Sequence, residues 1–304
     1  MSEAKFKKIM MFLSTDPHPS PFDILFAYDS GVDVVVYYGS VTAKTAGSLI
    51  LDAMFPRGPD GIKYTIVFIG GKNYDECVKI AEVAKKTYFK PFVASTIIDP
   101  AGAFTTSSAM VVKIFSCLKT KGIDPTKVKY TILGGAGRVG RCATYLLAKE
   151  GATVITTERH PLIEELKERA KEINEKIGAE RVLAYEKPTD KPETIYDACK
   201  DADVILSTGP PARTLLPLEV LSKLEKCVVV ADVNATPPYG VEGIKPSADC
   251  KPLKKLPKVT GIGALAIGAF RNNIQRELIK KAFEKPGSFF GLDETYEVAL
   301  ELAE

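Results

Sequence analysis

Residues 133–141, LGGAGRVGR, contain four glycines, and the last three of them have the spacing of a phosphate-binding loop. They follow the apolar segment YTIL directly and open a segment of helical character, RVGRCATYLLAKEG. Glycines at this spacing allow a tight turn and a close backbone approach to a pyrophosphate, which the amides at a helix N-terminus attract. Glycines also form ordinary turns, but a strand before the loop and a helix after it indicate a dinucleotide site. The residues expected to line this loop are Gly135, Gly137, Arg138, Val139 and Gly140.

The next apolar segment, ATVITTE, ends in an acid, Glu158, 18 residues after Gly140. An acid at this place accepts hydrogen bonds from the ribose hydroxyls and repels a 2′-phosphate, which favours NAD. The neighbouring Arg159 favours NADP, because a guanidinium can hold that phosphate. The alternative is that both side chains only form a solvated strand end. We expect NAD or NADP to be used, with NAD slightly preferred.

Two more loops follow apolar runs further along the chain, STGPPA and ADVNATPPYG. In open parallel sheets, ligands bind at the carboxyl ends of strands, so both loops are candidates for the nicotinamide side of the site. Proline and glycine could instead merely end the strands, but polar residues next to an apolar run favour a site. The candidate residues are Ser207, Gly209, Asp232 and Asn234.

The first 120 residues carry polar clusters of their own, at the ends of two predicted strands. A single acid at a helix start is usually a cap, whereas several at one sheet edge are more typical of a binding site. Hydride transfer needs a second substrate, and these clusters are the candidates to bind it. They comprise Asp16, Asp23 and Asp29 in one segment and Asp99, Thr105 and Thr106 in another.

Apolar runs of four to seven residues alternate with helical patterns along the chain, which is typical of β-α-β units and parallel sheets. A helical stretch from Thr105 to Lys121 is closed by KGIDPTK, so a domain boundary is predicted near Gly122. From there to about Thr260 the order of elements suits a dinucleotide-binding domain, and beyond Gly261 the pattern is helical, with a break at KPGSFFG. The predicted fold class is α/β, with a Rossmann-type doubly wound parallel sheet and a second α/β domain.

The composition excludes several classes of protein. The 304 residues are 45% hydrophobic and 26% charged, and the formal net charge of +3 is spread among acids, so nucleic acid and membranes are not expected partners. The apolar run Ile9–Leu13 is too short for a signal-peptide core or a membrane span, and we expect a cytoplasmic protein. Six scattered cysteines are expected to be buried free thiols, and two histidines provide no usual metal site.

Seven segments in this order resemble the NAD(P)-dependent methylene-tetrahydromethanopterin dehydrogenases of methylotrophic bacteria. They are SPFD with YDSG, FIGGKN, DPAGAFTTSSAMV, GGAG, ADVILSTGP, DVNATPPYGVEGI and GIGALAIG. The resemblance covers nearly the whole chain. It implies a pterin-substrate domain of residues 1–121 with 262–304, a Rossmann domain of residues 122–261, and a homo-oligomer, either a trimer or a dimer of trimers.

The resemblance also implies hydride transfer from the methylene bridge of the pterin to NAD(P), leaving the methenyl form. Asp23 would help to bind the pterin or stabilise positive charge, and Arg271 stands where the family has a lysine linked to catalysis. Arginine keeps the charge but cannot give up its proton. Tetrahydrofolate derivatives are the alternative class of substrate. A paralogue with a different pterin reduction, or a non-catalytic nucleotide-binding protein, also stays open.

Overall fold

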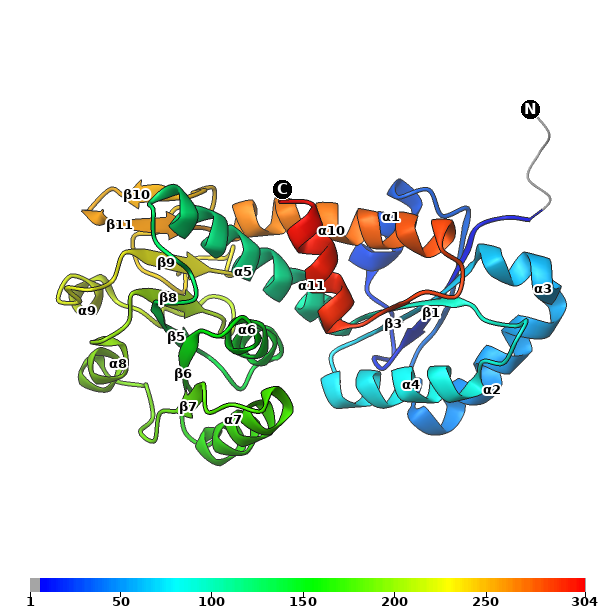
Figure 1. Cartoon of the computed structure of the whole chain (residues 1–304), viewed down its shortest axis with the longest axis horizontal. Coiled ribbons are helices and arrows are strands. Elements are labelled where there is room, and N and C mark those ends of the chain that lie inside the picture. Colours follow the sequence, from blue (N-terminus) through cyan, green and yellow to red (C-terminus); the bar gives the residue numbers. More distant parts are fainter. Residues whose placement is uncertain (1–5, 304) are drawn as a thin grey trace. The chain divides into compact units, whose positions relative to one another are not determined.

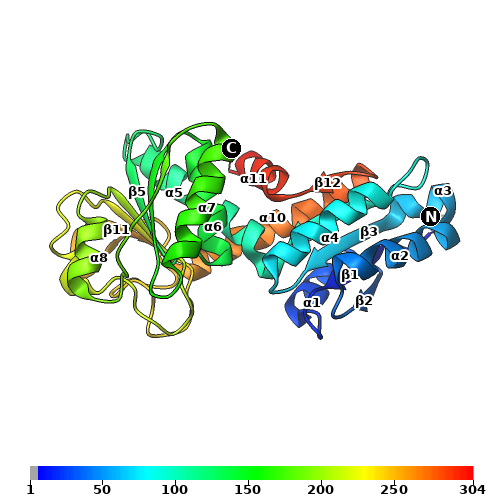
Figure 2. The ribbon, with the colours of Figure 1, turned by 90° about the horizontal axis from the view of Figure 1, so that it is seen from below.

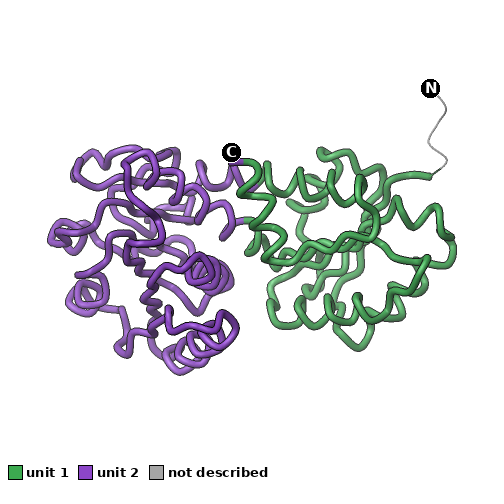
Figure 3. Tube along the Cα trace, viewed as in Figure 1, with its two compact units in different colours: residues 1–105, 272–302 green, residues 106–271, 303–304 purple. Residues whose placement is uncertain are grey.

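The computed structural model describes residues 6–303, which form two compact units (Figure 3). The first unit runs to Thr105 and also includes Asn272–Leu302, and the second comprises Thr106–Arg271 with Ala303. Both boundaries fall inside long helices, α5 (Ala103–Thr120) and α10 (Ala264–Glu284). The boundaries expected from the sequence lay just after α5, at Gly122, and in the last residues of the strand before α10, after Gly261. Gly and Pro mark where a helix ends, but the surface that its side chains pack against decides the unit to which each half belongs.

The first unit is built on a five-stranded parallel sheet with the order β12-β4-β3-β1-β2. Its central strands are fully buried, as expected of a parallel sheet covered on both faces. The strands are β1 (Ile9–Ser14), β2 (Val34–Tyr38), β3 (Thr65–Gly70), β4 (Ser95–Asp99) and β12 (Phe289–Phe290).

Helices α1 and α10 cover one face of this sheet, and α2 and α4 cover the other (Figures 1 and 2). Helix α4 shows why these segments are helical: Asn73 caps its first turn, acids follow the cap, and lysines occupy the last turn. The helices of the unit besides α10 are α1 (Pro21–Asp29), α2 (Ala43–Met54), α3 (Gly58–Gly61), α4 (Tyr74–Thr87) and α11 (Leu292–Glu301). Short 3-10 turns are η1 (Phe55–Arg57), η2 (Ile62–Tyr64) and η3 (Pro100–Gly102).

The second unit contains a seven-stranded sheet with the order β10-β11-β9-β8-β5-β6-β7. In Figure 1, α6 and α7 lie on one side of this sheet and α8 and α9 on the other. The strands are β5 (Lys129–Leu133), β6 (Thr153–Thr157), β7 (Val182–Ala184), β8 (Val204–Ser207), β9 (Val229–Asp232), β10 (Lys251–Leu253) and β11 (Leu256–Ile262). The helices are α6 (Arg138–Lys149), α7 (Ile163–Ile177), α8 (Pro192–Cys199) and α9 (Leu218–Leu221), with α5 from Thr106 onward and α10 up to Arg271.

One strand pairing in the second sheet was not predicted from the sequence. Strand β10 runs antiparallel to β11, whereas the other neighbouring strands of the second sheet, including β11 and β9, are parallel. Strands β10 and β11 read KPL and LPKVTGI, and their prolines interrupt the β pattern. The break expected at KPGSFFG contains β12, which pairs with β4. Two residues are too few to show a strand period.

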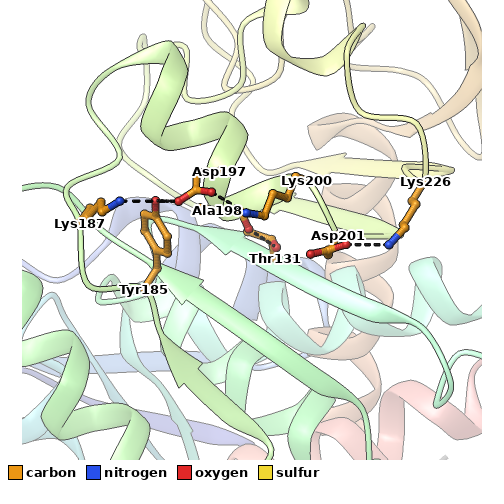
Figure 4. A network of polar contacts seen from close by, with 8 residues as sticks. All are labelled: Thr131, Tyr185, Lys187, Asp197, Ala198, Lys200, Asp201 and Lys226. Atoms are coloured by element: carbon orange, nitrogen blue, oxygen red, sulfur yellow. Dashed lines mark hydrogen bonds and ion pairs between the residues drawn. The ribbon is translucent and has the colours of Figure 1, made fainter.

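A polar network joins Tyr185, the residue after β7, to α8 (Figure 4). The Tyr185 hydroxyl donates to Asp197 Oδ2 at 2.7 Å, and Lys200 Nζ lies 2.7 Å from Asp197 Oδ1. These two donors lower the pKa of Asp197, and desolvation raises that of Tyr185 to about 12. These bonds stabilise the edge of the sheet at β7, which takes no part in the glycine-loop site.

The cysteines are not all free thiols, which corrects the expectation from the sequence. Cys117 in α5 and Cys250 before β10 form a disulfide, whereas four other cysteines are buried and free. Nothing in the spacing of two cysteines 133 residues apart could predict this pairing.

One helical stretch among the described residues, Pro100–Thr120, is long and apolar enough to cross a bilayer by composition and length alone. Of its most apolar window, 78% is buried inside the protein, as in a core helix.

Candidate active site

The glycine loop lies where the strand order of the second sheet reverses. Strand β5 is flanked by β6 on one side and β8 on the other, so the loops after β5 and β8 meet at this point. Gly134 has a φ of +88°, and a Cβ there would lie 2.7 Å from the backbone nitrogen of Gly209. The two loops therefore form one cradle. Such a switch point is the usual ligand-binding place in an open α/β sheet.

Glycine is required at two of the three predicted loop positions for lack of space. A Cβ at Gly140 would overlap the carbonyl oxygen of Gly134, and one at Gly135 would overlap Thr156 Oγ1. Gly137 is exposed and forms the N-cap of α6. Next to it, Arg138 is exposed at the first helical position, and Val139 is partly buried.

Thr208 is a residue of this cradle that the sequence analysis missed. Its buried hydroxyl donates to the carbonyl oxygens of Leu133 at 3.1 Å and Gly134 at 3.0 Å. These bonds hold the loop after β8 against the start of the glycine loop. The only signal in the sequence was its position between Ser207 and Gly209, two residues that were selected.

Glu158 ends beside the glycine loop, as its place after β6 requires. Its side chain is largely buried, with 6% exposed. Oε2 accepts a hydrogen bond from the backbone amide of Ala136 at 3.3 Å, and Oε1 accepts one from the amide of Arg159 at 3.0 Å. The carboxylate thus supports the loop backbone, while Arg159 is partly exposed beside it.

Asp232 and Asn234 organise the loop after β9. Asp232 is fully buried, and its two oxygens accept from the amides of Asn234 and Val241, each at 3.0 Å. Burial raises the pKa of Asp232, and these amides act in the opposite direction. A Cβ on Gly240 would overlap Ser207 Oγ, so this loop packs tightly on the end of β8. Asp232 and Ser207 are therefore both buried where these two chain segments pack together.

The cradle fits a dinucleotide. Side-chain-free backbone at Gly134, Gly135 and Gly140 is needed for the loop to close, and the exposed Gly137 opens a helix of 12 residues toward solvent. Free amides at such a helix start attract phosphate, and Arg138 adds a positive charge. Glu158, which follows β6, lies where an acid would contact the ribose of a dinucleotide. No cluster of three or more His, Cys, Asp or Glu residues suited to a metal occurs within residues 6–303.

In the first unit, Asp16 lies at the corresponding reversal of strand order, between β1 and β3. Its Oδ1 accepts from the backbone amide of Lys72 at 3.1 Å, and its carbonyl accepts from the amide of Ser40 at 2.8 Å. The neighbouring Thr15 hydroxyl accepts from the amide of Asn73 at 3.3 Å. Asp16 thus joins the loops that follow β1, β2 and β3 at the carboxyl edge of the sheet.

Asp99 ends β4 at the same edge and forms the cap of α5. Oδ1 accepts from the amide of Phe104 at 2.8 Å, and Oδ2 accepts from the Thr105 hydroxyl at 2.6 Å. Both Asp99 and Thr105 are buried. Thr106, which is partly buried, begins the second unit.

Asp23 is in the first turn of α1 and is 5% exposed. Its Oδ1 accepts from Gln275 Nε2 of α10 at 3.2 Å, and Gln275 Oε1 has no hydrogen-bond partner. Gln275 was not selected from the sequence, although its place one helical turn after Arg271 puts both on one side of α10. Arg271 itself is 8% exposed.

Asp29 is not brought together with the other acids. It is exposed at the last residue of α1, and the residues after it bond to Lys8 at the start of β1. In a β-α-β unit the helix runs antiparallel to its strand, so the end of α1 lies at the amino edge of the sheet. Asp16, Asp23 and Asp99 remain as the candidates at the carboxyl edge.

Comparison with known proteins agrees with this arrangement. A family model described as "Methylene-tetrahydromethanopterin dehydrogenase, N-terminal" matches residues 21–101. Among solved structures, quinate dehydrogenase from Corynebacterium glutamicum in complex with NAD is 13% identical, with a TM-score of 0.53 over 98% of this chain and 100% of that chain. Ornithine carbamoyltransferase from Pyrococcus furiosus is 12% identical, with a TM-score of 0.55 over 91% of this chain and 84% of that one. These two likenesses show the fold alone.

Two curated relatives come from Methylorubrum extorquens. The bifunctional protein MdtA is 31% identical over 297 residues, which is 98% of this chain and 99% of the relative. The NAD(P)-dependent methylenetetrahydromethanopterin dehydrogenase is 36% identical over 300 residues, again 98% of this chain and 99% of the relative. Because this identity extends over nearly all of both sequences, the chain belongs to the methylenetetrahydromethanopterin dehydrogenase family.

Proposed function

We propose that this protein is an NAD(P)-dependent oxidoreductase of one-carbon metabolism that interconverts the methylene and methenyl forms of tetrahydromethanopterin. Full-length similarity to a dehydrogenase of that name supports the substrate. The observation that carries the cofactor is the closed cradle of Gly134, Gly140, Thr208 and Gly209 at the switch point of a Rossmann sheet. When bound there, the nicotinamide supplies the hydride acceptor.

In this reaction the side chains have to position the two substrates and stabilise the charge that develops. The methylene carbon loses a hydride and not a proton, and the adjacent nitrogens stabilise the resulting cation, so no general base is required. Asp23 suits this task, because its carboxylate favours positive charge and can accept from donors on the pterin. Gln275 holds that carboxylate by a hydrogen bond at 3.2 Å. Asp16 and Asp99 shape the loops at the same sheet edge.

Arg271 is proposed to position the pterin by its fixed positive charge. It stands at the place of a lysine in the family pattern, and at 8% exposed it is not a freely solvated surface arginine. A guanidinium stays protonated, so any role in this site is electrostatic and not proton transfer.

The proposal is tested by measuring NADH and NADPH formation at 340 nm from methylene-tetrahydromethanopterin and methylene-tetrahydrofolate, side by side. We expect saturable turnover with the methanopterin substrate, and a higher kcat/KM for it than for the folate. Tight cofactor binding without turnover on either pterin would contradict the proposal and indicate a nucleotide-binding protein.

We further propose that the chain forms a homo-oligomer through α1 and β2. Strand β2 is an edge strand of the first sheet, and Tyr28 of α1 accepts a hydrogen bond from the amide of Val35 of β2 at 3.3 Å. Large apolar side chains are exposed on both elements, and an edge strand with such side chains is typical of an interface. They are Phe22, Leu25 and Tyr28 on α1 and Val36, Tyr37 and Tyr38 on β2. The assembly proposed from the family resemblance is a trimer or a dimer of trimers.

A further inference from the structure

The disulfide between Cys117 and Cys250 lies at a pocket of the second unit that is open to solvent. A cavity of about 420 Å³ lies between α5 and the segment before β10, and its walls include Val112, Ser116 and Phe270. Both cysteines line this cavity as well.

An ion pair and the disulfide both cross this pocket. In the ion pair, Lys113 Nζ lies 3.1 Å from Asp249 Oδ2, with the Asp249 side chain 56% exposed. A pair that is so accessible to water contributes little to stability. The other link is the disulfide, whose Cα atoms are 5.6 Å apart. The covalent bond is therefore the stronger connection between α5 and the β10–β11 pair.

The pair also differs from other cysteines of the chain in its access to solvent. Cys77 and Cys227 are buried, and desolvation raises the pKa of each thiol to about 12. Such thiols stay protonated and unreactive near neutral pH. Cys250 is partly exposed, whereas Cys117 behind it is 1% exposed. One sulfur can thus meet a reagent from solution, and the second can resolve it.

We propose that Cys117 and Cys250 are a reversible modification site for low-molecular-weight thiols and disulfides, which sets the stability of the second unit. In the oxidising direction, the Cys250 thiolate attacks a small disulfide RSSR, forms a mixed disulfide and releases RS⁻. The Cys117 thiolate then attacks Cys250 Sγ and releases the second RS⁻. The balance is two cysteine thiols and RSSR giving the protein disulfide and two RSH. Reduction by a thiol pool, as in the cytoplasm that the sequence predicts, runs the same steps backwards.

The redox state is measured by incubating the whole protein in buffers of oxidised and reduced glutathione at fixed ratios. The reaction is stopped with acid, and the thiols are labelled with N-ethylmaleimide in denaturant and counted by intact mass. We expect four labels per chain at oxidising ratios and six at reducing ratios. Six labels at every ratio would overturn the proposal, and so would a persistent glutathione adduct on Cys250.

The consequence for stability is measured as the difference in Tm with and without a phosphine reductant. The bond closes a loop between residues 133 apart, and its loss lowers Tm by about 5–15 °C. Cys250→Ser should have the low Tm and no response to reductant. The matched control, Cys227→Ala, removes a free buried thiol of the same unit and should keep the full response, even if its own Tm is lower. An unchanged Tm on reduction of the wild-type protein would show that the bond does not hold this unit.

Discussion

At the scale of single residues, Glu158 connects cofactor choice to the loop backbone. Glu158→Gln removes the charge but keeps an acceptor for the amide of Ala136, which now lies 3.3 Å from Oε2. We expect this variant to shift the ratio of kcat/KM values toward NADP by about fivefold or more, corresponding to about 1 kcal/mol of lost repulsion. Glu158→Ala should show the same shift and in addition bind both cofactors more weakly. An unchanged ratio in both variants would mean that the carboxylate does not reach the ribose.

Asp23 should affect the pterin and not the nucleotide. The nucleotide cradle is built from residues of the second unit, whereas Asp23 bonds to Gln275 within the first. Asp23→Asn should therefore lower kcat on the pterin, with the Kd for NADH kept within about twofold. The control is Asp52→Asn, which changes an exposed acid of α2 in the same unit. Equal damage to NADH binding, read from cofactor fluorescence, would indicate misfolding and not a role at the substrate.

Two variants of Arg271 test the size and the charge of its side chain separately. Arg271→Lys should retain or raise dehydrogenase activity, because it keeps the charge and restores the family's residue type. Arg271→Ala should lower kcat/KM about 30-fold or more, corresponding to about 2 kcal/mol for a charged hydrogen bond. Arg276→Ala is the matched control, since Arg276 is an exposed arginine on the same helix. If both Arg271 variants and the control equal the parent, Arg271 is not in the active site.

At the scale of elements, Asp99 was predicted to bind the substrate, and in the structure its side chain stabilises the first turn of α5. Asp99 accepts from the amides of Phe104 and Thr105 and from the Thr105 hydroxyl, and all of these groups are buried. Asp99→Ala leaves these donors without a partner and should reduce the free energy of unfolding by about 2–3 kcal/mol in urea. Asp99→Asn keeps one acceptor oxygen and should lose less. Equal losses in the two variants would contradict this account.

At the scale of the whole molecule, the β2 edge of the first sheet predicts assembly. Leu25 of α1 is 64% exposed, and Leu25→Asp should separate the oligomer into single chains of 33.0 kDa, because an interface core does not accept an unpaired charge. The measurement is light scattering coupled to size exclusion. Leu183→Asp is the control, since Leu183 is 57% exposed on β7, an edge strand of the other sheet. A parent that already runs as a single chain would refute the proposal.

The sequence alone determined the features that depend on neighbours in the chain. The runs YTIVFIG and KYTILGG became buried parallel strands, and the glycines of GGAGRVG became the loop before α6. Local sequence patterns suffice for these features, because the spacing of apolar side chains and the backbone freedom of glycine depend on only a few neighbouring residues. The placement of Glu158 beside the loop also followed, since strands next to each other in a Rossmann sheet end at one edge.

Tertiary structure alone decided which distant groups meet. Asp23 bonds to Gln275 across 252 residues, and Cys117 bonds to Cys250 across 133. It also separated Asp29 from the other acids and divided α5 and α10 between two units. No local pattern encodes such pairings, because they depend on how each helix packs against a sheet assembled from both ends of the chain.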